Sequence, residues 1–244
     1  MNRRGYITIA ILVLAAATAV ALVLVLHRPS SAPGGRSSAK YVIALDAGHG
    51  GKDPGGVVGD LLEKNVNLAI VKRVQAQMES DPKMRPYVTR TVDVYIPLEE
   101  RIRRAEEAKA SIYLTIHVNS FDLPEVVGME TWVDSTRKDA DPSWVLASMV
   151  LESISAATGG RNRGVRSQEL YLQRTKMPAI AVEVGYITNP NERALLADPV
   201  YQDKIALGIL NGLHKFIAYL EEEQAPVGPA SSSAAKATST SKKP

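Results

Sequence analysis

Two hydrophobic patterns alternate along the chain between residues 41 and 220. Short, mostly apolar or alternating runs are typical of strands, and apolar residues repeated every three or four positions are typical of helices. The first pattern predicts strands at 41–45, 85–90, 111–117, 128–133, 169–173 and 179–184. The second predicts helices at 64–78, 97–110, 143–157 and 201–220. Because the strands are apolar on both faces and separated by helices, we expect one α/β domain at 41–223, with about six strands between helices on both faces.

The first 26 residues show a different pattern. Arg3 and Arg4 precede an apolar run at 7–26 that is interrupted only by two threonines. A helix of this length spans roughly 30 Å, the hydrocarbon thickness of a bilayer. The run exceeds the core of about 7–15 residues of a signal peptide, so we expect an uncleaved membrane anchor at 1–26, with a cleaved signal as the alternative. The two arginines place the N-terminus inside, and the domain at the outer face of the cytoplasmic membrane, or secreted after cleavage.

Two other segments lack core-forming residues. Residues 27–40 are rich in Pro, Gly and Ser, as in a flexible linker, and residues 224–244 have the composition of a disordered tail. The net charge is +3, but all 26 acidic residues lie within 41–223, where they outnumber the bases. This balance argues against nucleic acid as a partner, because nucleic-acid binding needs a concentrated basic surface. The absence of cysteine excludes disulfides and a thiol nucleophile.

Four polar side chains lie where a core of strands and helices would not place them. His49 follows the first predicted strand, His117 closes the third, and Glu183 lies within the apolar run 179–184. Glu63 opens the first long helix. Catalytic groups of open α/β sheets gather at the carboxyl ends of strands. A buried carboxylate costs several kcal/mol unless it is paired or faces a site, so Glu183 is the least easily explained of the four.

Each of these residues alone has an ordinary explanation. A single histidine at a strand end is usually only hydrogen-bonded, Glu63 suits a helix N-terminus, and Glu183 could pair with an arginine. Together, two histidines and a carboxylate form a ligand set of catalytic zinc, which leaves a fourth position for a water whose pKa falls to about 7. Another carboxylate must move the proton of that water, and Glu183 suits this role. The residues alone leave open which carboxylate binds the metal. Asp46 is a third candidate, as a ligand or as a hydrogen-bond partner of His49.

The motifs around these residues resemble the zinc-dependent N-acetylmuramoyl-L-alanine amidases of bacterial cell walls. The resemblance covers about 41–220 and rests on motifs in this order: 45–55, 63–69, 89–90, 97–101, 116–120 and 177–190. It implies that His49, Glu63 and His117 bind one zinc ion, that Glu183 is the catalytic carboxylate, and that the single α/β domain has a mixed sheet. Asn119 and Arg90 lie within two of these motifs and near the site in sequence, so both are candidates for substrate binding.

The resemblance also implies a reaction. These enzymes hydrolyse the amide bond between the lactyl group of N-acetylmuramic acid and L-alanine in peptidoglycan. The expected partners are therefore peptidoglycan and, through the N-terminal helix, the cytoplasmic membrane. The sequence does not show whether an activator protein is needed. Two alternatives are a zinc hydrolase of the same fold that cuts another peptidoglycan amide, and a non-catalytic regulator that binds the wall. Such regulators usually lack a ligand or the catalytic carboxylate, whereas this sequence has all four residues.

Overall fold

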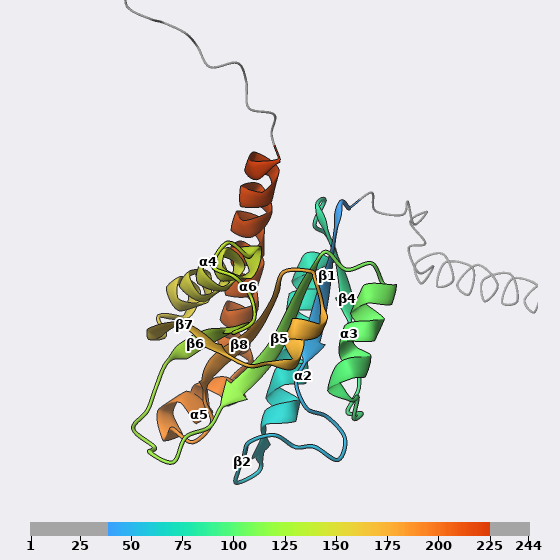
Figure 1. Cartoon of the computed structure of the whole chain (residues 1–244). Coiled ribbons are helices and arrows are strands. Elements are labelled where there is room, and N and C mark those ends of the chain that lie inside the picture. The colour runs from blue at the N-terminus through green and yellow to red at the C-terminus, as the bar shows by residue number, and fades with distance from the viewer. Residues whose placement is uncertain (1–38, 225–244) are drawn as a thin grey trace, which may run out of the picture. The chain divides into compact units, whose positions relative to one another are not determined.

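The structure of this protein, a computed structural model, describes residues 39–224 (Figure 1). The predicted membrane segment at 1–26 lies outside the described residues. So do the predicted linker at 27–40, except its last two residues, and the predicted tail at 224–244, except its first. Within 39–224, no helix combines the length and the apolar character that a membrane span requires.

A six-stranded sheet forms the centre of the domain, with the strand order β4-β1-β5-β8-β6-β7. Strands β4, β1, β5 and β8 are parallel, whereas β6 is antiparallel to β8 and parallel to β7. The sheet is therefore mixed, and the predicted α/β fold is confirmed. Its strands are β4 (Met84–Val88), β1 (Tyr41–Ala47), β5 (Ile112–Asn119), β8 (Ala179–Tyr186), β6 (Met129–Asp134) and β7 (Asn162–Gln168).

Helices connect these strands. The helices are α2 (Glu63–Met78), α3 (Leu98–Glu107), α4 (Pro142–Thr158), the 3₁₀ helix η1 (Tyr171–Arg174), α5 (Pro190–Ala197) and α6 (Pro199–Glu223). A short hairpin of β2 (Val57–Val58) and β3 (Leu61–Leu62) leads into α2. The N-terminus of α4 shows how the sequence sets these bounds: the Asp141 side chain accepts a hydrogen bond from the Ser143 amide, and a proline occupies the first turn.

The two faces of the sheet are covered unequally (Figure 1). Helices α2, α4 and α6 cover one face, where large strand residues such as Ile43 and Leu114 are fully buried. Helix α3 and η1 cover the other face, where the strands present the small residues Ala44, Ala179 and Ala181. Successive strand residues point to opposite faces, so in β8 the small Ala179 and Ala181 alternate with the larger Ile180 and Val182. The small residues leave room on the second face for a pocket of about 360 Å³, which Ala181 helps to line.

The predicted strand at 169–173 is wrong. The edge strand is β7, over Asn162–Gln168, and the chain then turns into η1. The side chains of β7 are exposed or only partly buried, so this strand gives no apolar signal. Leu172, which suggested alternation, is buried because the 3₁₀ turn directs it against α3. Helix α5 and the hairpin β2–β3 were also absent from the prediction, because both are too short to show a clear period.

Candidate metal centre and active site

Three of the predicted site residues meet at the carboxyl edge of the sheet. His49 follows β1, His117 lies near the end of β5, and Glu63 is the first residue of α2. One ligand atom from each lies within 4.8 Å of the others. The Oε1 atom of Glu63 is 3.1 Å from His49 Nε2 and 3.0 Å from His117 Nδ1. Two imidazole nitrogens and a carboxylate oxygen thus face one point, although 54 residues separate Glu63 from His117.

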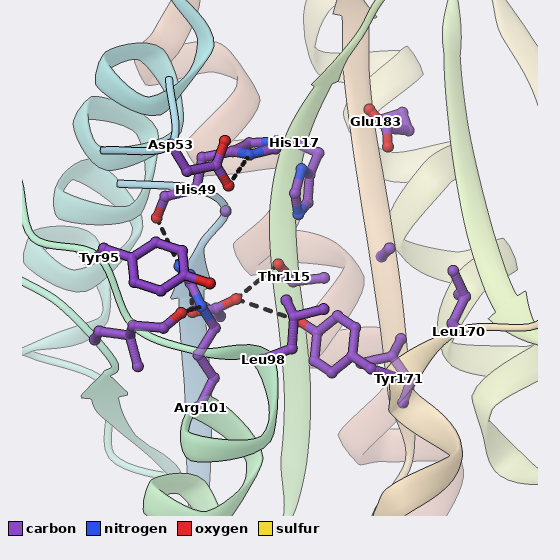
Figure 2. A pocket seen from close by; sticks show the side chains of 15 residues that line it. His49, Asp53, Tyr95, Leu98, Arg101, Thr115, His117, Leu170, Tyr171 and Glu183 are labelled. Atoms are coloured by element: carbon purple, nitrogen blue, oxygen red, sulfur yellow. Dashed lines mark hydrogen bonds and ion pairs between the residues drawn. The ribbon is translucent and has the colours of Figure 1, made fainter. Parts of the chain in front are cut away.

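His49 is held in place by its backbone and by a second carboxylate. Its φ of 60° lies in the left-handed region, which non-glycine residues adopt mainly where the surroundings enforce it. The other ring nitrogen, Nδ1, is 2.8 Å from Asp53 Oδ2 (Figure 2). This contact leaves Nε2 directed at Glu63, which is the usual way a carboxylate orients a metal-binding histidine.

The carboxylate of Glu63 is fixed on both oxygens. Oε2 accepts a hydrogen bond of 2.8 Å from the Gly56 amide, and Oε1 accepts one of 3.1 Å from the Val118 amide. Asn67, one helical turn further along α2 and fully buried, donates its Nδ2 to Oε1 at 3.2 Å. Burial raises the pKa of Glu63, but the two histidines and the Gly56 amide lower it well below its ordinary value. The carboxylate is therefore charged and held still.

The loop around these residues has no room for further side chains. A Cβ atom on Gly48 would lie 2.3 Å from Cε1 of His117. A Cβ atom on Gly55 would lie 2.5 Å from Glu63 Oε2 and 2.6 Å from His49 Cδ2. These two glycines therefore allow the backbone to approach the cluster closely.

Glu183 lies beside this cluster on β8. It is in register with His117 on β5 and with Glu130 on β6. Its Oε2 atom is buried and has no hydrogen-bond partner among the described residues, which excludes the expected alternative of an arginine pair for this atom. Burial, opposed by the charge of His117 and reinforced by Glu63 and Glu130, raises the pKa of Glu183 to about 7. Glu183, His49 and His117 all line the pocket (Figure 2).

Asp46 has neither of the roles considered for it from the sequence. Its side chain is only 1% exposed and pairs with Arg101 at 2.9 Å. It also accepts hydrogen bonds from the hydroxyls of Thr89 and Thr115. Asp53 takes the position beside His49 instead. Asp46 thus belongs to a buried network under the pocket.

The two candidates for substrate binding differ in their surroundings. Arg90 is 3% exposed and donates to the carbonyls of Ala47 at 2.8 Å and Gly48 at 2.9 Å, which lead into His49. These contacts give Arg90 a supporting role in the loop. Asn119 is partly buried, and its Oδ1 accepts a hydrogen bond of 2.8 Å from the Ser120 amide. Substrate binding by Asn119 stays a prediction.

The arrangement fits a divalent cation such as zinc. Catalytic zinc is held by three protein ligands from histidine and carboxylate side chains, with one open position. Burial lowers the pKa of His49, but the acids Glu63 and Asp53 outweigh this effect and raise it to about 9. Burial likewise lowers the pKa of the partly buried His117, and Glu63 and Glu183 raise it above its ordinary value. The acids around these rings therefore favour positive charge at this place, which a cation would supply. Glu183, whose Oε2 has no hydrogen-bond partner among the described residues, lines the same pocket.

Comparisons with known proteins give a consistent result. The sequence model of the family Amidase_3, described as N-acetylmuramoyl-L-alanine amidase, matches residues 43–215. N-acetylmuramoyl-L-alanine amidase LytC of Bacillus subtilis (strain 168) is 37% identical over 171 residues, which make up 70% of this chain but 34% of LytC.

Solved structures show the same similarity. The N-acetylmuramoyl-L-alanine amidase from Clostridium difficile 630 has a TM-score of 0.70 at 32% identity, over 76% of this chain and 100% of that one. The CwlD amidase from Clostridioides difficile, solved in complex with the GerS lipoprotein, has a TM-score of 0.66 at 29% identity, over 73% of this chain and 99% of that one.

Proposed function

We infer the function from one premise: this chain belongs to the N-acetylmuramoyl-L-alanine amidase family, Amidase_3. We propose that 41–223 is a catalytic domain that hydrolyses the amide bond between the lactyl group of N-acetylmuramic acid and L-alanine in peptidoglycan. The observation that carries this proposal is Glu183, with its buried and unpartnered Oε2 atom, next to the cluster of His49, Glu63 and His117. A carboxylate with these neighbours suits proton transfer beside a metal-activated water.

We assign the roles of the residues as follows. His49, Glu63 and His117 would hold one zinc ion, which when bound polarises the amide carbonyl and makes water acidic. Asp53 holds the imidazole of His49, and the amides around Glu63 hold its carboxylate. Glu183 removes the proton of the attacking water and then delivers it to the nitrogen of the departing alanine. Its pKa of about 7 allows both steps at neutral pH.

The proposed substrate determines on which side of the cytoplasmic membrane the domain acts. Peptidoglycan lies outside the cytoplasmic membrane, so we propose that the domain acts there. Anchoring by residues 1–26 stays a prediction from the sequence, and so does release after cleavage. Separation of membranes from culture medium, followed by detection of the full chain in each fraction, distinguishes anchored from released protein.

Product analysis tests the proposed reaction. Purified full-length protein is incubated with peptidoglycan, with and without a chelator, and the products are analysed by mass spectrometry. We expect glycan that ends in free lactyl groups and peptides with a free N-terminal alanine, loss of both with chelator, and recovery with added zinc. Peptides cut at another amide would instead favour the hydrolase of different specificity. Binding to the wall without any product would favour the non-catalytic regulator.

A further inference from the structure

One lysine that lies over a pocket-lining tyrosine has no role in the proposed chemistry. Tyr95 lines the pocket and is 41% exposed (Figure 2). The ammonium of Lys52, an exposed residue of the loop that carries His49, lies over the Tyr95 ring at 4.6 Å from its centroid. The pair therefore places a positive charge at the rim of the site.

Two loops meet here: the loop of Lys52, which also carries His49, and the loop of Tyr95, which precedes α3. The acidic groups of these two loops already have partners. Asp53 contacts His49, and Asp93 accepts hydrogen bonds from Lys64 and from the Gly51 amide. Within residues 39–224, no ion pair includes Lys52. Other lysines of the described residues, such as Lys72 and Lys109, also have no ion pair, so what distinguishes Lys52 is its position over a tyrosine that lines the pocket.

The backbone fixes Lys52 and Tyr95 relative to each other. Gly50 and Gly51 have φ values of 130° and 58°, and both pack directly on the backbone of the loop that carries Tyr95. A Cβ atom on Gly50 would lie 2.3 Å from the carbonyl oxygen of Val94, and one on Gly51 would lie 2.6 Å from the Tyr95 nitrogen. The backbones of Gly50 and Gly51 thus lie directly against those of Val94 and Tyr95, which places the Lys52 and Tyr95 side chains next to each other.

We propose that Lys52 and Tyr95 form a subsite that binds a carboxylate of the peptide released by the reaction. This inference rests on the proposed function, because stem peptides carry free carboxylates and the glycan next to the scissile bond is joined through a neutral lactyl amide. The Lys52 ammonium lies over one face of the Tyr95 ring, so a group that binds beside that face meets a positive charge. An anionic group is the ligand that an unpaired ammonium at this place favours.

Two synthetic substrates that differ only in charge test the subsite. One is N-acetylmuramoyl-L-alanyl-D-glutamate, and the other is the same compound with both carboxyl groups converted to amides. In the full-length protein, Lys52→Gln should lower kcat/KM for the acidic substrate about five- to tenfold, mainly through KM. The amidated substrate should be cleaved within twofold of the wild-type rate. Lys52→Arg should retain the preference, and added salt should reduce it in the wild type.

The controls separate this subsite from a structural effect. Lys72→Gln removes an exposed lysine from α2 and should leave both substrates unchanged, and zinc content should be equal in all variants. Equal loss on both substrates after Lys52→Gln, or no loss on either, would overturn the subsite while the proposed function stands. Absence of cleavage of either substrate by the wild type would overturn the proposed function itself and the subsite with it.

Discussion

His117 and Glu183 lie opposite each other, in register, on the neighbouring parallel strands β5 and β8. Neighbouring strands are about 4.8 Å apart, so the hydrogen bonds of the sheet set the separation between a metal-ligand candidate and the candidate proton carrier. Glu63 and His49 approach from a helix and a loop, but the backbone amides around them and Asp53 hold both. The site thus places its proton carrier on the most rigid part of the fold.

Replacement of Glu183 by glutamine should remove catalysis and leave the metal. Glutamine has nearly the same shape, but it cannot take a proton from water, so we expect a loss of about 10²- to 10⁴-fold in kcat. Hydrolysis of a muramoyl dipeptide, together with zinc analysis of the same sample, measures both effects. A variant that retains zinc and the wild-type rate would remove Glu183 from the mechanism.

The loss of zinc affinity in an alanine variant should depend on whether the replaced residue is a ligand, a partner of a ligand or outside the cluster. Asp53→Ala removes the partner of His49 Nδ1 and should weaken zinc binding about 10- to 100-fold, as for other outer partners of metal ligands. His49→Ala or His117→Ala removes a ligand and should weaken it further. His214→Ala is the matched control, because His214 contacts Asp81 and belongs to no candidate metal cluster of the described residues. Competition with a zinc-binding dye gives each affinity; an equal loss in the His214 variant would contradict the assigned cluster.

Alanine substitutions at two glycines distinguish the effect of crowding at the site from that of backbone strain: Gly55 precedes β2, and Gly59 lies in the turn between β2 and β3. Gly55 and Gly59 have φ values of 66° and 59°, so alanine costs about 1–2 kcal/mol at either position. At Gly55 the new Cβ would also lie 2.5 Å from Glu63 Oε2, whereas at Gly59 it would meet nothing within 4 Å. Gly55→Ala should therefore lower zinc affinity and activity, and Gly59→Ala should lower only the free energy of unfolding. The same zinc affinity in both variants would show that crowding at Gly55 is unimportant.

The sequence predicts those parts of the molecule that a short segment determines. The apolar runs at 41–45 and 179–184 are confirmed as strands. The motifs contain the three residues of the candidate metal cluster, His49, Glu63 and His117, and also Glu183, which lines the pocket with the two histidines. What the runs do not show is how the size of the side chains differs between the two faces of the sheet. In 179–184 the small residues Ala179 and Ala181 lie on the same side as Glu183, the side of the pocket, and this difference in size is visible in the sequence only once the faces are known.

The contacts that support the site could not be read from the sequence. Asp46 and Arg101 are 55 residues apart, and nothing in the local pattern of either shows that they meet. Asn67 was detectable in principle, because it lies one helical turn after Glu63 on the same face of α2. Asp53 was not, because the path of the loop decides which acid reaches His49. The polar strand β7 was missed because an edge strand with exposed faces needs no apolar residues.

The buried pair of Asp46 and Arg101 should make stability depend on pH. Burial raises the pKa of Asp46, but Arg101 and the hydroxyls of Thr89 and Thr115 lower it below its ordinary value of 3.8. Asp46→Asn leaves the arginine without its acid, so we expect a loss of about 3–5 kcal/mol in the free energy of unfolding at pH 7.

The sign of the pH dependence follows from the direction of this shift. Because the folded protein holds the Asp46 carboxylate in its charged form more strongly than the unfolded chain does, the stabilisation is present in full above pH 3.8 and disappears as the pH falls through the lower pKa of the folded state. The difference between wild type and Asp46→Asn in urea unfolding should therefore shrink below pH 3.8. Glu107→Gln, which removes a solvent-exposed pair with Arg103, should change stability little at any pH. A difference between wild type and Asp46→Asn that stays constant down to pH 2 would mean that packing, rather than the charge of Asp46, supports the floor of the pocket.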